Sequence, residues 1–345
     1  MSPGPGGKPG KGAGRGPASG AAPGLAILCV KGSEAFIGPV VDGLSPHTPL
    51  ELVVAERGED FLAAVERHPQ IWIEWGHDLA AALTNQARER LAGKRVFVRI
   101  HHFEVFTGLA DRLDYRAVTD LIFVCRHFRD VFLARRPEVR EQVPRIHVIP
   151  TGLDLARFGF RERTPGHNLA YVGYLNYKKA PMVLMHAFYA LHRADPRFRL
   201  HVAGKFQDPP FEAACRWFLE ANRLTDAVTF YDWVADMPAW LADKHFLIST
   251  SLSESQGLGI MEAMATGCLP LVNHFPGAET IYNHRHLWRN LDELAALAAR
   301  GGDPRQARRF IEVNYGLADM NARLQTMWNS GEEVVFPGPV WPGWG

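Results

Sequence analysis

The sequence predicts an α/β protein made of two doubly wound domains that face a central cleft. Three observations favour this fold. The chain has 345 residues, which is enough for two domains of ordinary size. Between ends rich in Pro and Gly, short β-type runs alternate with helical patterns, as is typical of parallel sheets covered on both faces. This alternation is interrupted at Pro150–Asp154, which we interpret as the boundary between the domains.

The expected elements divide evenly between the two halves. In the first half the expected strands are Leu25–Val30, Glu51–Ala55, Ile71–Trp75, Arg95–Ile100, Asp120–Cys125 and Arg145–Ile149. In the second half they are Leu169–Gly173, Arg199–Ala203, Val228–Tyr231, Phe246–Thr250 and Leu269–Asn273, with no further strand. The clearest helices are Asp78–Ala92, His127–Arg136, Pro181–Arg193, Phe211–Arg223, Gly257–Thr266, Leu291–Arg300, Pro304–Val313 and Leu317–Asn329.

These elements predict four segments. Residues 1–24 are expected to be a disordered tail, and residues 331–345 a loosely ordered Pro/Gly/Trp tail. Residues 25–154 form the N-terminal domain, and residues 155–330 form the C-terminal domain with its trailing helices. The apolar run after the first tail is only six residues long, which is too short for a signal peptide, so we expect a cytoplasmic protein.

Composition excludes several classes of protein. Hydrophobic residues make up 47% of the chain and charged residues 22%, as in ordinary globular proteins. The net charge of +1 argues against a nucleic-acid-binding protein. The four cysteines are scattered without a C-x-x-C pair, which supports neither a zinc site nor a disulfide framework. No apolar run approaches the roughly 18–20 residues that span a bilayer.

Three familiar ligand-binding motifs are also missing from the sequence. No G-x-G-x-x-G follows an expected strand, which disfavours nicotinamide and flavin enzymes, and no P-loop motif is present. The chain has no D-x-D pair, the usual carboxylate clip for a metal-bound diphosphate. We therefore expect no cofactor and no dedicated metal ion.

The most informative stretch runs from Ser249 to Gly267. A buried strand leaves through small hydroxyl residues, passes Glu254 and starts a helix near Gly257. In that helix Glu262 is the only charged residue, and a carboxylate on so apolar a helix costs about several kcal/mol unless an outside group satisfies it. Hydroxyls of a bound ribose are one such group. Free amides at the helix start favour an anion, so this unit has the parts of a diphosphate-sugar clamp.

Glu254 and Glu262, with seven residues between them, match the E-x7-E motif of retaining GT-B glycosyltransferases. The surrounding sequence resembles glycosyltransferase family 4 (group 1), whose usual form is close to E-G-F-G-L-x-x-x-E-A-M-A-x-G. The resemblance implies a GT-B fold with two Rossmann-like domains, the N-terminal one on the acceptor side. It also implies that Glu254 contacts the donor sugar, that Glu262 binds the ribose, and that amides around Gly257 and Leu258 bind the diphosphate. Gln256 replaces the usual aromatic residue and is expected to be tolerated in this donor-binding turn.

A second match lies at the start of the same domain. The segment from Ala170 to Pro181 resembles the family's F-V-G-R-L-x-x-x-K-G and includes Gly173. In the family an Arg and a Lys stabilise the departing diphosphate. Lys179 occupies the Lys position and Lys178 lies beside it, but Tyr174 replaces the Arg, for which Lys178 or Arg99 could compensate.

The N-terminal half matches the family less closely. His101, after the strand Arg95–Ile100, aligns with a histidine that family members place near the donor sugar and acceptor. A purely structural histidine is an equal alternative at this position.

The resemblance implies a metal-independent, retaining transfer of a sugar from a nucleotide-diphosphate sugar. The acceptor would be a glycan, a lipid-linked molecule or a small molecule, and a lipid-linked acceptor could bring peripheral contact with the inner membrane face. Two other classes stay open. One is a non-catalytic sugar-nucleotide or glycan-binding protein, which Tyr174 favours. The other is a nucleotide-sugar epimerase or hydrolase of the same architecture.

Overall fold

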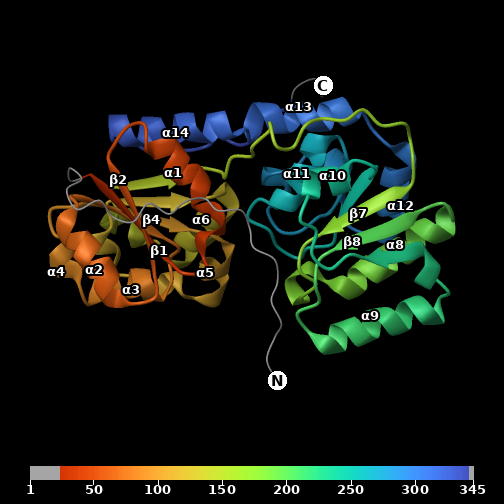
Figure 1. Cartoon of the computed structure of the whole chain (residues 1–345), viewed down its shortest axis with the longest axis horizontal. Helices are drawn as coiled ribbons and strands as arrows, with labels where there is room; N and C mark the ends of the chain where they lie inside the picture. Colours follow the sequence, from red (N-terminus) through yellow and green to blue (C-terminus); the bar gives the residue numbers. More distant parts are fainter. Residues whose placement is uncertain (1–23, 342–345) are drawn as a thin grey trace.

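The computed structural model describes residues 24–341. Most of the expected first tail and the last four residues of the expected second tail lie outside this range. The described part forms two α/β halves, one of which follows the other along the long axis of the molecule (Figure 1).

The N-terminal half contains a six-stranded parallel sheet in the order β2-β1-β3-β4-β5-β6. Its strands are β1 (Leu25–Val30), β2 (Leu50–Ala55), β3 (Gln70–Glu74), β4 (Arg95–Ile100), β5 (Asp120–Phe123) and β6 (Arg145–Val148). Its helices are α1 (Gly38–Leu44), α2 (Gly58–Arg67), α3 (Asp78–Asn85), α4 (Arg88–Leu91), α5 (His102–Thr107), α6 (Arg126–Arg135) and α7 (Val139–Gln142).

The C-terminal half contains a second six-stranded parallel sheet in the order β12-β11-β10-β7-β8-β9. Its strands are β7 (Asn168–Val172), β8 (Arg199–Ala203), β9 (Val228–Phe230), β10 (Phe246–Ser249), β11 (Leu269–Asn273) and β12 (Leu287–Trp288). The helices are α8 (Pro181–Ala194), α9 (Pro209–Ala221), α10 (Met237–Leu241), α11 (Leu258–Thr266), α12 (Leu291–Arg300), α13 (Pro304–Asn314) and α14 (Leu317–Ser330).

The predicted fold class is confirmed, with two local corrections. The expected absence of a strand after Asn273 is wrong, because β12 pairs with β11 through two residues. The expected helix Asp78–Ala92 is divided into α3 and α4. A strand of two residues carries almost no alternating pattern, which is why the sequence did not reveal it.

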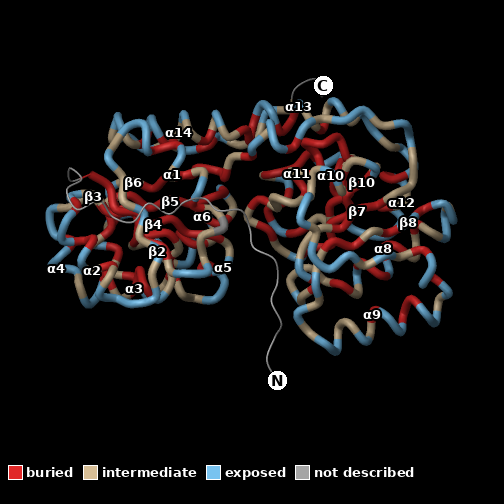
Figure 2. The backbone as a smooth tube through the Cα atoms, in the orientation of Figure 1, coloured by how far each residue is buried: buried red, intermediate tan, exposed pale blue. Residues whose placement is uncertain are grey.

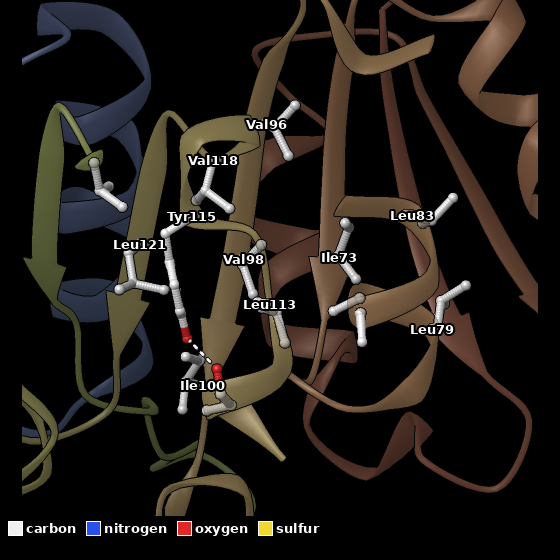
Figure 3. Packing of buried hydrophobic residues seen from close by; sticks show 14 of the residues in the cluster. Ile73, Leu79, Leu83, Val96, Val98, Ile100, Leu113, Tyr115, Val118 and Leu121 are labelled. Carbon is white, nitrogen blue, oxygen red and sulfur yellow. Dashed lines mark hydrogen bonds between the residues drawn. The ribbon is translucent and has the colours of Figure 1, made fainter. Parts of the chain in front are cut away.

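Apolar side chains bury both faces of the N-terminal sheet. On one face, alternate residues of β4 pack with Leu113, Tyr115 and Val118 from the segment that follows α5 (Figure 3). The hydroxyl of Tyr115 donates a hydrogen bond of 2.7 Å to the carbonyl of Ala110, which satisfies its one polar group. In both halves the buried residues concentrate in the strands (Figure 2), as expected for sheets covered on both sides.

The last helix, α14, returns to the N-terminal half. It lies beside α1 (Figure 1), and its residues Met320, Leu324 and Met327 share a core with Leu25 and Ile27 of β1. By its packing α14 therefore belongs with the first sheet, although the expected C-terminal domain extended to residue 330.

The described part of the expected C-terminal tail is also packed. Val335 forms a β-bridge with Val148 at the edge of the first sheet, and Phe336 is buried. The ring of Trp341 stacks on that of Phe310 in α13, with centroids 4.0 Å apart. This segment therefore contacts both halves of the molecule.

A buried carboxylate anchors α14 to the sheet. Asp120, at the start of β5, accepts hydrogen bonds from Arg95 (3.1 Å), Arg145 (2.7 Å) and His147 (3.0 Å). Arg95 also donates to the carbonyls of Met327 and Trp328 at the end of α14. Burial alone would raise the pKa of Asp120, but its hydrogen bonds with Arg145, His147 and Arg95 hold that pKa well below the usual range.

We predict that Asp120→Asn lowers the free energy of unfolding by about 3 kcal/mol at pH 7, because the partly buried Arg95 and Arg145 lose their buried counter-charge. A lowered folded-state pKa stabilises the fold above the unfolded-state pKa, and that stability is lost as the pH falls below about 4. Urea unfolding of wild type and variant at pH 7 and pH 3.5 should therefore show a smaller difference at the lower pH. Glu66→Gln, which removes an exposed ion pair with Arg90, is the control and should change little. An equal effect of the two substitutions would contradict the prediction.

Candidate active site

The two sheets direct the carboxyl ends of their strands toward a shared cleft, where ligands of doubly wound sheets bind. A cavity of about 270 Å³ lies there. The N-terminal half lines it with Phe36, Trp75, His101, His102, Phe103, Val124 and Thr151. The C-terminal half lines it with Lys178, Glu254, Ser255, Gln256, Gly257 and Leu258. A smaller cavity of about 70 Å³ adjoins it at Glu254 and is also lined by Lys179 and Gly259.

Glu254 lies in the loop after β10 and is only 6% exposed. Its carboxylate forms ion pairs with Lys179 and, at 3.2 Å, with Lys178. Both lysines come from the short 3-10 turn after β7, and Ser251 donates a further hydrogen bond of 2.8 Å. Burial would raise the pKa of Glu254, but the two lysine charges lower it to about 2. Glu254 is therefore ionised at neutral pH, and the three side chains together carry one net positive charge.

The start of α11 adds to this positive charge. Gly257 has φ +72°, and a Cβ atom there would lie 2.7 Å from the hydroxyl of Tyr282. Glycine is therefore required both by the backbone conformation and by the lack of space. Within residues 24–341, the amides of Leu258 and Gly259 donate no hydrogen bond. Two free amides at a helix amino end, next to a net positive cluster, favour an anion.

Glu262 lies one turn further along α11. In the described part of the chain its carboxylate has no hydrogen-bond or ion-pair partner, although the residue is partly buried. Burial raises its pKa to about 7, opposed only by the charge of Arg157. Glu262 does not line the cavity that contains Glu254 and Lys179. Its role in binding ribose stays a prediction.

Gln256 uses its side chain to connect the halves. Its amide nitrogen donates to the carbonyl of Thr151 (2.7 Å), and its amide oxygen accepts from the Thr151 amide (2.9 Å). This paired contact is buried and joins the α11 turn to the segment after β6. The side chain is thereby occupied, so any contact of Gln256 with a donor would come from its backbone.

His101 is held by a buried carboxylate. Its Nε2 lies 2.9 Å from Glu74 Oε1, and burial lowers the pKa of His101 even though Glu74 favours the charged form. Arg99 also contacts Glu74 and donates to the hydroxyl of Thr151 at 2.8 Å. Arg99 is buried in this network and lines neither cavity, so it is not placed to compensate for Tyr174 as the sequence suggested. His101 is both structurally anchored and placed at the cleft, so the two interpretations of this residue are compatible.

His102 is a site residue that the sequence did not reveal. Its Nε2 lies 2.8 Å from the hydroxyl of Ser253, which belongs to the opposite half, directly before Glu254. Burial and the nearby charge of Lys178 lower the pKa of His102 to about 4, so the ring is neutral at pH 7. The pair of adjacent histidines was visible in the sequence. Only the structure shows that His101 contacts Glu74, whereas His102 contacts Ser253 across the cleft.

The turn after β7 approaches β8 closely. Gly173 has φ +139°, and a Cβ atom on Gly204 would lie 1.9 Å from the carbonyl oxygen of Gly173. The side chain of Tyr174 is 50% exposed and lines neither cavity. The donor-binding roles of Gly173, Tyr174 and Lys178, like those of the other predicted site residues, stay predictions.

A larger cavity of about 590 Å³ lies at the opposite, amino end of the second sheet, between α8 and α12. None of the predicted site residues lines it. Because ligands of parallel sheets bind at the carboxyl ends of the strands, we place the site in the cleft in spite of the smaller volume there.

The described residues contain no group of three His, Cys, Asp or Glu side chains placed to hold a metal ion. Metal independence nevertheless stays a prediction. Among the helices of residues 24–341, none is both long and apolar enough to cross a membrane.

Residues 166–301, which contain every predicted site residue except His101, match the family described as Glycosyl transferases group 1. The resemblance to this family is confirmed. Two curated α-mannosyltransferases, from Xanthomonas campestris and Xanthomonas oryzae pv. oryzae, are 26% and 25% identical over 183 residues. Both are named GDP-mannose:cellobiosyl-diphosphopolyprenol alpha-mannosyltransferase. The alignment covers 50% of this chain, and it spans about half the length (48%) of each of these relatives.

Solved structures extend the likeness to both halves. Anabaena Alr3699/HepE in complex with UDP has a TM-score of 0.71 at 14% identity, over 89% of this chain and 99% of that one. Sucrose-phosphate synthase from Thermosynechococcus elongatus has a TM-score of 0.68 at 15% identity, over 89% and 98%. At these identities the likeness concerns the fold alone, and the predicted GT-B fold is confirmed.

We predict that Gln256→Ala lowers the free energy of unfolding by about 3 kcal/mol, because the buried amide and carbonyl of Thr151 lose their partners. Chemical unfolding measures this change. Gln325→Ala, at an exposed position on α14, is the control and should stay within about 0.5 kcal/mol. A stability loss no larger than that of the control would show that the paired contact does not hold the halves together.

Proposed function

We propose that this protein is a retaining glycosyltransferase. It would move a sugar from a nucleotide-diphosphate sugar to a glycan, lipid-linked or small-molecule acceptor, without a metal ion. The observation that carries the proposal is the ion-paired cluster of the buried Glu254 with Lys178 and Lys179, beside the free amides of α11. This cluster lies at the cleft and within the residues that match group 1 glycosyltransferases.

The proposed reaction exchanges one bond at the anomeric carbon. The acceptor hydroxyl oxygen forms a bond to that carbon while the bond from the carbon to the diphosphate oxygen breaks. The proton of the hydroxyl passes to the departing phosphate, so charge and atoms balance without a redox step. Attack on the face that the diphosphate leaves would retain the anomeric configuration.

The site residues would act mainly through charge. Negative charge grows on the diphosphate as it departs, and Lys179 with the amides of Leu258 and Gly259 would stabilise it. Glu254, fixed by its lysines, would orient the donor sugar with His101. Glu262 would gain the partner it lacks by accepting hydrogen bonds from ribose hydroxyls.

The relatives suggest which donors to examine first. The curated relatives are named for GDP-mannose and a diphosphopolyprenol-linked acceptor, whereas similar folds have been solved with UDP and UDP-glucose. A lipid-linked acceptor would bring the protein to a membrane surface. The first donors to examine therefore include both GDP-linked and UDP-linked sugars.

A second candidate is a non-catalytic sugar-nucleotide-binding protein on the same fold. Tyr174 favours it, because the position that carries an Arg in the family here carries an exposed aromatic ring outside both cavities. Donor binding without transfer to any acceptor would distinguish it from the enzyme.

We predict that a panel of GDP- and UDP-sugars raises the melting temperature of the wild-type protein for at least one donor. Lys179→Met should reduce transfer from that donor by roughly 100-fold, because it removes a cation from the leaving group. Lys94→Met is the matched control, since Lys94 lies at the amino end of β4, away from the cleft. The proposal fails if no donor shifts the melting temperature and none is consumed.

Glu262→Gln provides a separate test of the ribose site. A folded-state pKa raised to about 7 means that wild-type protein loses stability as the pH rises from about 4.5 to 7. The variant avoids this loss, so we expect it to be more stable than wild type at pH 8 by on the order of 2 kcal/mol. The donor should bind it at least about 10-fold more weakly, because the charged acceptor for the ribose hydroxyls is gone. Calorimetry measures both quantities, and unchanged donor affinity would remove Glu262 from the site.

A further inference from the structure

One edge of the N-terminal sheet is open. The two sheets end in β2 and β6, and in β12 and β9. The edge at β6 is covered, because Val148 forms a β-bridge with Val335, and β9 and β12 have only three and two residues. β2 has six residues, and within residues 24–341 its only strand partner is β1. It is therefore the one long edge that the described residues leave open.

The ladder between β1 and β2 shows which backbone groups of β2 are unpaired. The carbonyls of Pro49 and Ala55, at the two ends of β2, accept hydrogen bonds of 2.9 and 3.0 Å from the side of β1. Because the backbone groups of successive residues point to opposite edges of a strand, the odd-numbered residues face β1. Leu50, Leu52 and Val54 therefore direct their N–H and C=O groups outward. In the described part of the chain these groups have no hydrogen-bond partner.

The same three residues also leave apolar side chains uncovered. Alternate side chains of a strand lie on one face, so Leu50, Leu52 and Val54 share a face of the sheet. Leu50 packs against the core that includes α1 and α14, but Leu52 is 42% exposed and Val54 is 37% exposed. The open edge therefore combines unpaired backbone groups with exposed apolar area.

β2 lacks the features that usually protect an edge strand. Native proteins place lysine, proline or a bulge on open edges to prevent pairing with another chain. The sequence of β2, LELVVA, contains neither lysine nor proline, and its register with β1 is continuous. Its one charged residue, Glu51, lies on the opposite face and forms ion pairs of 2.6 Å with Arg67 and His68. No charge on the exposed face of β2 therefore opposes an added strand.

The pattern of β2 is complementary to itself. When a second β2 lies antiparallel with the two Leu52 residues opposite each other, Leu50 lies opposite Val54 on both sides of the centre. Each outward residue then exchanges both of its backbone hydrogen bonds with its counterpart, so that every outward group gains a partner. On the other face Glu51 lies opposite Val53, and no like charges meet. A shift by two residues in either direction would leave an outward residue of β2 without a counterpart in the strand.

We propose that β2 is the dimerisation edge of this protein. Two copies pair their β2 strands antiparallel about a two-fold axis at Leu52 and join their N-terminal sheets into one. A ligand without a peptide backbone would cover the apolar side chains but would leave the outward N–H and C=O groups unpaired. The inference goes beyond the proposed function and does not depend on it, because no residue of β2 lines the cleft cavities.

Sedimentation velocity of the full chain over a concentration series tests the proposal, and we expect a dimer that dissociates on dilution. Leu52→Lys places two like charges opposite each other and should raise the Kd of the dimer at least about 10-fold. Leu291→Lys, at a leucine of the C-terminal half that is 36% exposed, is the matched control and should leave the Kd unchanged. An equal mixture of the Leu52→Lys and Leu52→Glu variants should restore the dimer, because opposite charges then meet at the two-fold axis.

Two results of this series would overturn the proposal. A wild-type protein that stays monomeric at every concentration would exclude a second copy as the partner and leave the edge to a strand of another protein. Equal dissociation by Leu52→Lys and Leu291→Lys would place the dimer contact elsewhere. Because residue 52 is exposed, circular dichroism should show that all of its variants are folded.

Cysteine cross-linking tests the register of the two strands. The four native cysteines are buried, so an introduced thiol at the edge reacts without competition. In the proposed register the Cα atoms of the two residues 52 are about 5.5 Å apart, within the range of a disulfide. The two residues 54 are separated by roughly 13 Å along the strands, which no disulfide can span. Mild oxidation should therefore cross-link Leu52→Cys and leave Val54→Cys largely uncross-linked, and equal cross-linking of the two would overturn the proposal.

Discussion

The architecture of the cleft depends on the burial of one carboxylate. At 6% exposure Glu254 cannot remain ionised without partners, and the nearest available cations are Lys178 and Lys179 on the adjacent turn after β7. The ion pairs therefore fix two loops from neighbouring strands against each other. They also leave an excess positive charge next to the free amides of α11, an arrangement that favours an anion. A single requirement of charge pairing thus fixes the floor of the cleft and places net positive charge there.

The same principle connects the two halves. Glu74 is buried in the N-terminal half and is satisfied by Arg99 and His101. Arg99 then reaches Thr151, whose backbone pairs with the side chain of Gln256 in the α11 turn. A continuous chain of hydrogen bonds therefore runs from one wall of the cleft to the other. Together with α14 and the segment that passes Val148, it limits how far the walls can separate while the polar groups stay paired.

Local sequence patterns were sufficient for most of the fold. Buried parallel strands are continuous apolar runs, and the expected strand bounds lie within one or two residues of the observed ones. The proximity of Glu254 and Lys179 followed from the motifs, because both lie after neighbouring strands. Contacts between residues distant in the sequence could not be predicted. Thr151 and Gln256 are separated by 105 residues, and the core position of α14 depends on a helix in the other half. The positive φ of Trp75 also could not be predicted, because bulky side chains almost always adopt a negative φ.

The two walls of the cleft carry different free-energy costs, one from buried charge and the other from backbone strain and exposed apolar area. The C-terminal wall buries charge, and its cost is offset by ion pairs that already exist without a ligand. The N-terminal wall, lined by Phe36, Trp75 and Phe103, carries backbone strain at Trp75 (φ +72°) and an exposed ring at Phe103. The stacking of the Trp75 indole on His101 and its hydrogen bond to the Ser33 carbonyl hold the strained residue in place. Conflicts between local preference and the observed structure concentrate at functional sites. A ligand that covers the aromatic wall would recover the exposed apolar area and would meet Lys178 and Glu254 on its other side. The charged wall is therefore fully paired without a ligand, whereas the aromatic wall keeps an exposed apolar ring at Phe103.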